Sequence, residues 1–261
     1  MIEGIKLVVK ELIFMFNDFR SGGIPFDRSK EYELRKKGYF TVENFICEEE
    51  CEALLVHIDA HSKKDFCWRD KYDSDIRIFG IEDLEVEFSN IFERHNLLNI
   101  YKKYISIDNI YQTVMAAKMK FTTDNRGSGG GWHRDTTNQR QLKFILYLSD
   151  VDDDNGCFQY LTSSHKLRNK FKSKGVLKDG YVKQRYAHDD AMVISKKLGL
   201  ELKSFIGRKG TLIVVDTSGI HRGRPMSNGI RYAITNYMAE KPFGSSISDL
   251  LVKNRHSNIN R

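Results

Sequence analysis

The sequence predicts an α+β fold whose core is a β-barrel or jelly roll. The first hundred residues carry apolar side chains mostly at helical spacing, whereas later segments are short, rich in β-branched and aromatic residues, and bounded by turn formers. The 261 residues contain three prolines and no low-complexity run or linker. We therefore expect a single domain over residues 1–261, with helices first and strands afterwards.

Residues 1–105 are expected to be mainly helical. Acids open the segment CEEECEALLVHIDAH at residues 47–61, where they favour the positive end of a helix dipole. Residues 83–105 show the same helical spacing of apolar side chains. A short strand, GYFTV at residues 38–42, precedes the first of these helices.

The apolar stretch at residues 5–16 carries its large side chains on one helical face. Lys6, Lys10 and Glu11 interrupt it, so it is too short and too charged to span a bilayer, and no transmembrane segment is expected. Two interpretations stay open, a helix that packs on the domain and a peripheral anchor at a membrane surface. Because the four cysteines show no disulfide-like spacing, we expect a reducing compartment and a cytoplasmic protein.

Residues 106–240 are expected to form the β core, followed by a C-terminal tail at residues 241–261. Five segments of this core have the composition of short strands, in which alternate side chains point to opposite faces. They are residues 110–121, 140–150, 156–161, 210–216 and 231–238.

A basic insert at residues 166–209 connects two of these strands. It holds thirteen Lys or Arg residues and four acids, a net charge of +9 in a chain whose total is +7. One hypothesis is that Lys170, Lys172 and Lys174 bind an anionic substrate that carries a phosphate, a carboxylate or a CoA thioester. The other is a solvated basic face. No basic platform studded with aromatic side chains is evident for stacking bases, so a nucleic acid is not expected as a partner.

The motif WHRD places His133 and Asp135 two residues apart. In an extended segment such residues project from the same face. A further histidine would complete a two-histidine, one-carboxylate face with open positions, the arrangement that non-haem Fe(II) oxygenases use. His221 is the best candidate, because it follows the buried strand GTLIVVD and a tight polar turn.

Arg231 opens the next strand, ten residues after His221. A guanidinium on the inner face of a barrel is costly unless it meets an anion, and a carboxylate-bearing cosubstrate would supply one. Arg224 is a rival anchor three residues after His221. We favour Arg231, because a strand residue points in a predictable direction.

Two other histidine positions suggest ligands less strongly. His57 and His61 lie one helical turn apart, but no neighbouring carboxylate with clear geometry is evident, so an exposed or core pair is the safer interpretation. His165 follows a strand end by several residues, and we expect it to be structural.

Several stretches together resemble the phytanoyl-CoA dioxygenase-like family of Fe(II)/2-oxoglutarate-dependent oxygenases. They are GWHRDT at 131–136, the strand and loop at 142–166, and GTLIVVDTSGIHRGRPMSNGIRYAITNYM at 210–238. LRKKGYFTVENFICEEECEALL at 34–55 is similar to the N-terminal strand and helix of that family.

The resemblance implies a double-stranded β-helix, a barrel of the jelly-roll or cupin type, flanked by N-terminal helices. It implies that His133, Asp135 and His221 hold Fe(II) and that Arg231 binds the distal carboxylate of 2-oxoglutarate. Gly223 would let the backbone approach iron or cosubstrate closely.

The implied activity is hydroxylation of a small, anionic metabolite or of a glycan- or lipid-linked substrate, with consumption of O2 and release of succinate and CO2. Related halogenases replace the carboxylate ligand with Ala or Gly, which Asp135 argues against here. The alternative is a non-catalytic, cupin-like metal-binding or sensing module.

Overall fold

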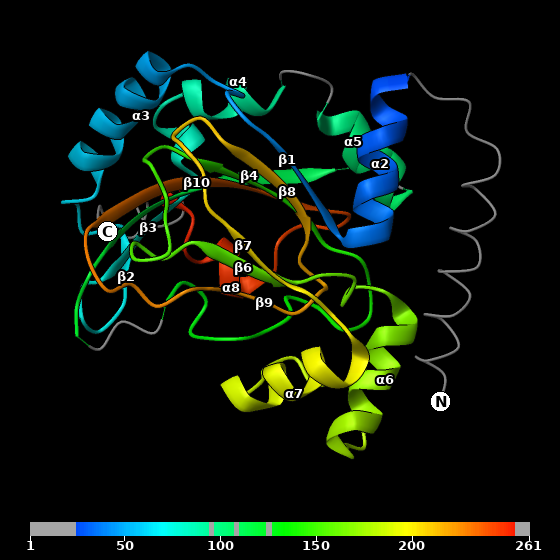
Figure 1. Ribbon diagram of the computed structural model, residues 1–261. Helices are drawn as coiled ribbons and strands as arrows, with labels where there is room; N and C mark the ends of the chain where they lie inside the picture. The colour runs from blue at the N-terminus through cyan, green and yellow to red at the C-terminus, as the bar shows by residue number, and fades with distance from the viewer. Residues whose placement is uncertain (1–24, 94–96, 107–109, 124–126, 254–261) are drawn as a thin grey trace.

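The computed structural model describes residues 25–93, 97–106, 110–123 and 127–253. Two antiparallel sheets form its core (Figure 1). The major sheet has seven strands in the order β1-β8-β5-β10-β4-β3-β2, and the minor sheet has the order β7-β6-β9. The strands are β1 Tyr39–Val42, β2 Trp68–Arg69, β3 Asp75–Phe79, β4 Tyr111–Lys120, β5 Leu142–Tyr147, β6 Phe158–Leu161, β7 Leu202–Phe205, β8 Leu212–Asp216, β9 His221–Gly223 and β10 Ile230–Ala239.

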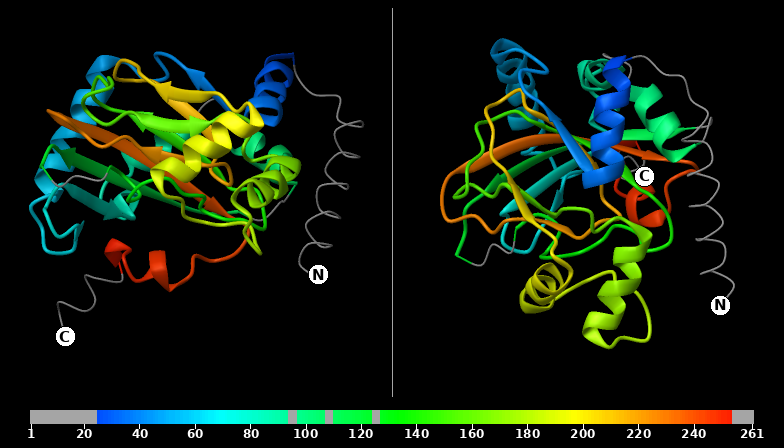
Figure 2. Two further views of the ribbon diagram at one scale, coloured as in Figure 1. Left: turned by 60° about the horizontal axis from the view of Figure 1, so that its bottom comes forward. Right: turned by 45° about the vertical axis from the view of Figure 1, so that its right-hand side comes forward.

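Helices cover the outside of this core in two groups (Figures 1 and 2). Helices α2 to α5 pack on the outer face of the major sheet, whereas α6 and α7 pack together beyond the minor sheet. Their bounds are α2 Pro25–Lys37, α3 Glu48–His61, η1 Ile81–Asp83, α4 Glu87–Glu93, α5 Leu97–Ile105, α6 Leu167–Leu177, α7 His188–Leu198 and α8 Ser245–Ser248. Among the described residues, none of these helices is long and apolar enough to cross a membrane.

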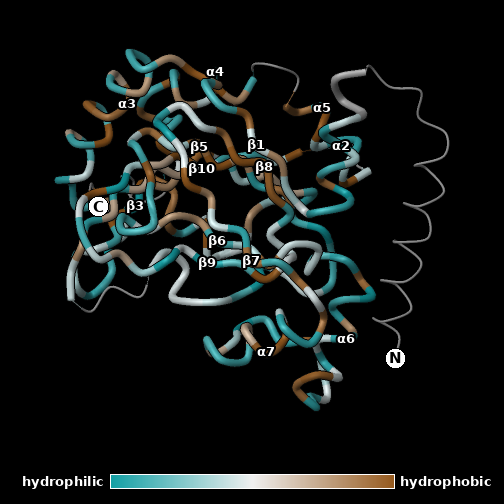
Figure 3. Tube along the Cα trace, viewed as in Figure 1, coloured by the Kyte–Doolittle hydropathy of each residue, from teal (hydrophilic) through white to brown (hydrophobic). Residues whose placement is uncertain are grey.

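The strand β8 shows how side-chain alternation builds the layers. Leu212 and Val214 join the core shared with the helices, whereas Ile213 and Val215 pack between the two sheets. Because both faces are covered, the whole strand is buried, and apolar segments concentrate in the central strands (Figure 3). A register slip of one residue would exchange these two sets, so the double burial fixes the register.

The α+β prediction is confirmed, but the N-terminal part is less helical than expected. Strands β2 and β3 lie within it and extend the major sheet. In β3, Ile76 and Ile78 face the helical core, while Arg77 lines an inner cavity. The charged residues mask the alternation in the sequence. Residues 83–105 also form two helices, α4 and α5, instead of one.

Two other boundaries differ from expectation. The basic insert contains a strand, β7, which pairs with β6 in the minor sheet and so belongs to the barrel itself. The expected C-terminal tail is packed where it is described, because Ile247, Leu250 and Leu251 contact Phe79 and Met115 of the major sheet. The apolar helix expected at residues 5–16 lies outside the described residues.

His165 yields a prediction about acid stability. The residue is buried, its Nε2 lies 3.1 Å from the carbonyl oxygen of Arg35, and burial lowers its pKa to about 4. Between pH 6.5 and 4, His165 is protonated in the unfolded chain but neutral in the folded chain. The free energy of unfolding therefore falls as the pH is lowered through this window. At pH 5 the part of the loss due to His165 alone should be about 2 kcal/mol relative to pH 7.5. Denaturant unfolding at both pH values measures it.

His165→Gln should remove this part of the acid sensitivity. His188→Gln, at an exposed histidine, is the matched control and should retain it. If both variants lose as much stability as the wild type on acidification, His165 does not carry the effect.

Candidate metal centre

The segment around His133 extends the minor sheet. The backbones of His133 and His221 exchange two N–H···O hydrogen bonds of 2.9 Å, and His133 forms a second antiparallel bridge with Arg185. The amide of Asp135 donates to the carbonyl of Thr217 at 3.0 Å. His133 and Asp135 therefore face the space between the sheets from an extended segment that pairs with β9, not from the edge of β5.

Arg134, between the two, points the opposite way and is fully buried. Its guanidinium donates to the carbonyl oxygens of Ser164 and Ser218, at 2.9 and 2.6 Å, and to the hydroxyl of Tyr186 at 3.0 Å. One side chain thus holds the WHRD segment to three others. This role of Arg134 was not predicted from the sequence. It could have been, because in an extended segment a residue between two inward-facing neighbours points to the opposite face.

Hydrogen bonds to the backbone orient both imidazoles. His133 Nδ1 lies 2.8 Å from the carbonyl oxygen of Gly131, and His221 Nδ1 lies 3.0 Å from that of Gly219. Since a carbonyl only accepts, each Nδ1 carries the proton and each Nε2 presents its lone pair. The Nε2 atoms lie 3.7 and 3.9 Å from the carboxylate oxygens of Asp135.

The protonation states of the three residues suit a cation. Burial and the neighbouring His133 lower the pKa of His221 to about 3, and burial also lowers the pKa of His133. Burial alone would raise the pKa of Asp135, but Lys143 and the histidines hold it well below its usual range. At neutral pH the group offers two neutral nitrogens and one carboxylate, all within 4.8 Å of one another.

A cavity of about 290 Å³ opens beside the three residues, between the sheets. Its lining is strongly basic: Arg77, Lys143, Arg185 and Arg231 all contribute. The ammonium group of Lys143 lies 2.8 Å from Asp135 Oδ2 and 4.2 Å from the ring centre of Tyr237. A second hollow of about 440 Å³ adjoins this cavity and shares Arg77, Gly129 and Arg185 with it.

Arg231 and Arg224, the two candidate anchors, lie in different surroundings. Arg231 is buried, lines the cavity, and has an unpartnered Nε. No carboxylate in the described part of the chain forms an ion pair with it, and its Nη2 contacts only the sulfur of Met119, at 2.7 Å. Arg224 is more exposed and pairs with Asp153. A buried, unpaired guanidinium suits an incoming carboxylate.

Two glycines shape the opening of the cavity. Gly129 has a φ of +83°, and a Cβ there would lie 2.3 Å from Cε1 of His133. Gly129 therefore packs directly on the imidazole ring of His133. At Gly223 a Cβ would lie 2.7 Å from the backbone nitrogen of Ser128, so the close approach that Gly223 permits is to that loop.

The structure does not bring Lys170, Lys172 and Lys174 to the cavity. Lys170 is buried, with its Nζ 3.4 Å from the carbonyl oxygen of Thr137, and Lys172 is exposed on α6. The basic insert contributes Arg185 instead. Arg77 was missed because its strand was missed; it pairs with Asp75 at 2.5 Å and lies 3.1 Å from Ser128 Oγ.

The family profile described as phytanoyl-CoA dioxygenase (PhyH) matches residues 34–233, which include His133, Asp135, His221 and Arg231. The chain belongs to this family. It is therefore a non-haem iron, 2-oxoglutarate-dependent enzyme, and its cofactor and cosubstrates are iron, 2-oxoglutarate and O2. No curated protein sequence matches the chain.

Solved structures confirm the jelly-roll fold of this family member. The epimerase SnoN, in complex with Fe3+, alpha ketoglutarate and nogalamycin RO, has a TM-score of 0.64 at 12% identity over 86% of this chain and 89% of that one. EctD from S. alaskensis with 2-oxoglutarate and 5-hydroxyectoine has a TM-score of 0.63 at 17% identity, with 86% and 82% covered. HygX from Streptomyces hygroscopicus, with nickel, 2-oxoglutarate and hygromycin B bound, has a TM-score of 0.55 at 14% identity, with 83% and 88% covered.

Proposed function

We propose that the chain is a single oxygenase domain that hydroxylates a small anionic metabolite, with His133, Asp135 and His221 as iron ligands. The observation that carries this proposal is the convergence of two Nε2 lone pairs and one ionised carboxylate on a basic cavity. When bound, iron with 2-oxoglutarate and O2 supplies the oxidation, with succinate and CO2 as co-products. The three donor atoms fit a divalent iron with open positions.

The residues of the chain bind and orient in this scheme. Arg231 receives the distal carboxylate of 2-oxoglutarate through a guanidinium that has no other carboxylate partner in the described chain. Lys143 holds one oxygen of Asp135 and so fixes the orientation of the carboxylate. The apolar core between the sheets keeps bulk water away from the reacting atoms.

The adjoining hollow supports an anionic substrate. It is lined by the rings of Trp68 and Tyr72, by Lys71, Arg77 and Arg185, and by two acids: Asp75 pairs with Arg77 and Asp70 accepts from Ser74, which leaves Lys71 and Arg185 for an anion. A phosphate or carboxylate held by Arg185 would leave the rest of a small molecule directed toward the triad, because Arg185 lines both spaces. Four free cysteines support a cytoplasmic location.

The family to which the chain belongs argues against the alternative drawn from the sequence, a non-catalytic, cupin-like metal-binding or sensing module. Iron-dependent release of succinate from 2-oxoglutarate distinguishes an enzyme from such a module. The unpaired Arg231 argues against a module that binds metal alone, since metal binding does not require a buried guanidinium.

Asp135→Ala should abolish succinate release, because it removes the only carboxylate of the triad. The expected loss is at least about a thousandfold, measured as iron-dependent succinate formation. Asp153→Ala, which removes an aspartate paired with Arg224 outside the cavity, is the control and should retain activity. Full activity of Asp135→Ala with iron bound would refute the ligand assignment.

Arg231→Ala should raise the KM for 2-oxoglutarate about a hundredfold, because a buried charge-assisted pair with the cosubstrate is lost. Arg224→Ala should change the same KM less than about threefold, since its guanidinium is partly exposed and pairs with Asp153. Steady-state kinetics with varied 2-oxoglutarate give both values. The reverse ranking would make Arg224 the anchor.

Arg185→Glu tests the class of substrate. A screen of phosphate- and carboxylate-bearing metabolites for substrate-stimulated succinate release should identify a substrate, and Arg185→Glu should raise its KM at least about tenfold. Lys172→Glu makes the same charge change on the exposed face of α6 and should leave that KM within about twofold. Equal rises in KM for the two variants would show that Arg185 acts only through the general positive charge of the surface.

A further inference from the structure

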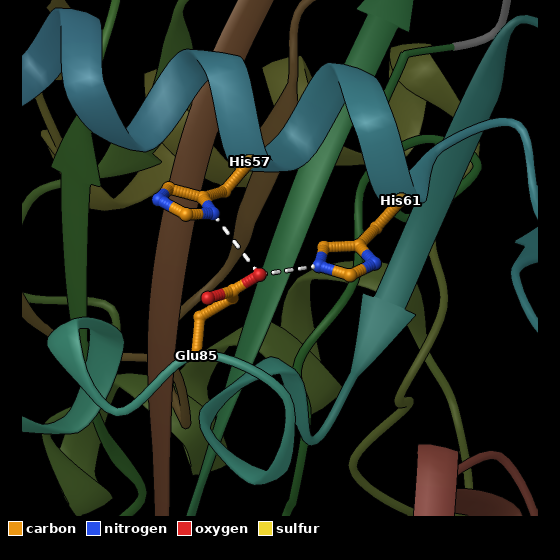
Figure 4. A group of neighbouring side chains, drawn as sticks. All are labelled: His57, His61 and Glu85. Atoms are coloured by element: carbon orange, nitrogen blue, oxygen red, sulfur yellow. Dashed lines mark hydrogen bonds and ion pairs between the residues drawn. The ribbon is translucent and has the colours of Figure 1, made fainter.

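Helix α3 carries His57 and His61 one turn apart, on the side that faces Glu85 (Figure 4). His57 Nδ1 lies 3.0 Å and His61 Nε2 lies 2.8 Å from the same carboxylate oxygen, Glu85 Oε1. In the sequence, no neighbouring carboxylate marks this histidine pair as a metal site. The fold supplies one from the link between η1 and α4.

We propose that His57, His61 and Glu85 form a second metal site, which binds a divalent transition ion of the zinc class. Two imidazole nitrogens and one carboxylate oxygen, all within 4.8 Å of one another, make a donor set that suits zinc. Calcium and magnesium favour all-oxygen ligands and are poor candidates. The site lies in the helical layer and shares no residue with the triad of His133, Asp135 and His221.

The present spacing is close to what a bound ion needs. With bonds of about 2.1 Å in a tetrahedron, ligand atoms lie about 3.4 Å apart. The nitrogen–oxygen distances here are 3.0 and 2.8 Å, so the carboxylate must withdraw by about half an ångström. Glu85 belongs to a short link and its side chain is a quarter exposed, so a small torsional change provides this room. Water would complete the coordination.

The surroundings hold the imidazoles and admit an ion. The ring of His57 packs edge-on against Phe88, with centroids 6.5 Å apart, and His61 lies 6.3 Å from Phe66. Beside His57 is a small hollow of about 180 Å³ whose lining includes Glu50 and Glu87. Glu50 and Glu87 thus add negative charge near His57, which favours a cation there.

A metal ion at this site would connect α3 with the link that follows η1. Both α3 and η1 already hydrogen-bond to strand β4. From α3, Asp59 accepts from Lys118 of β4 at 2.6 Å. From η1, Glu82 accepts from the amide of Val114 of β4 at 3.0 Å. An ion between α3 and Glu85 would close this frame, so zinc should raise the thermal stability of the chain.

Zinc stoichiometry of the full-length chain tests the proposal. After saturation and dialysis, the wild type should retain two zinc ions, one at each site, by elemental analysis. The double variant Asp135→Ala/His221→Ala should retain one, and His57→Gln/His61→Gln should also retain one. Loss of all zinc from the folded Asp135→Ala/His221→Ala variant, or two ions in His57→Gln/His61→Gln, would overturn the proposal. Circular dichroism verifies that each variant is folded.

A matched pair of glutamates separates ligation from charge. In the Asp135→Ala/His221→Ala background, Glu85→Gln should weaken zinc binding at least about tenfold by calorimetric titration. Glu87→Gln removes the same charge two residues away, outside contact with either imidazole, and should weaken it less than about fivefold. Equal affinities of the two variants would show that the carboxylate of Glu85 is only a hydrogen-bond acceptor. Neither measurement depends on 2-oxoglutarate or on turnover.

Discussion

Two reciprocal backbone hydrogen bonds between His133 and His221 set the geometry on which the proposed chemistry depends. They place the imidazole rings 4.2 Å apart, and the extended backbone then brings Asp135 to the same face. The bridge joins segments far apart in the sequence, so it forms only when the His133 segment pairs with β9 of the minor sheet. Arg134 secures it from behind through three buried hydrogen bonds. The pairing of these backbone segments therefore determines where the three side chains of the triad lie.

Charge balance is the second constraint on the cavity. Lys143 is neutralised by Asp135, and Arg77 by Asp75, whereas Arg231 has no acidic partner in the described residues. A buried guanidinium in this condition stores a free-energy cost that an arriving carboxylate removes. The cavity thus favours a dianionic cosubstrate before any metal contributes, and the family to which the chain belongs uses one. The proposed function assigns the second substrate to the basic and aromatic residues at the opening.

Local spacing predicted the central strands. It also placed His133 and Asp135 two residues apart and His221 after a strong strand, and the structure brings these residues and Arg231 to one cavity. Local spacing was not sufficient where contacts between distant segments determine the structure. Strand β3 was missed because Asp75 and Arg77 interrupt its apolar alternation, and they are tolerated only as a buried pair. Glu85 could not be assigned to His57 and His61, since contacts between distant segments bring the link after η1 to α3 (Figure 4). Lys170, Lys172 and Lys174 were proposed to bind substrate because of their charge. Charge alone does not show which way a side chain points.

The residues in and just after α8 support the cavity, and they are synthesised after the rest of it. Ile247, Leu250 and Leu251 support Met115 and Ala117, which line the cavity, from a position beyond the residues that match the family profile. Because a chain leaves the ribosome from its N-terminus, the triad and Arg231 are synthesised before this support. The wall of the cavity that Met115 and Ala117 form therefore takes its packing partners from residues that are synthesised after the proposed iron ligands and Arg231.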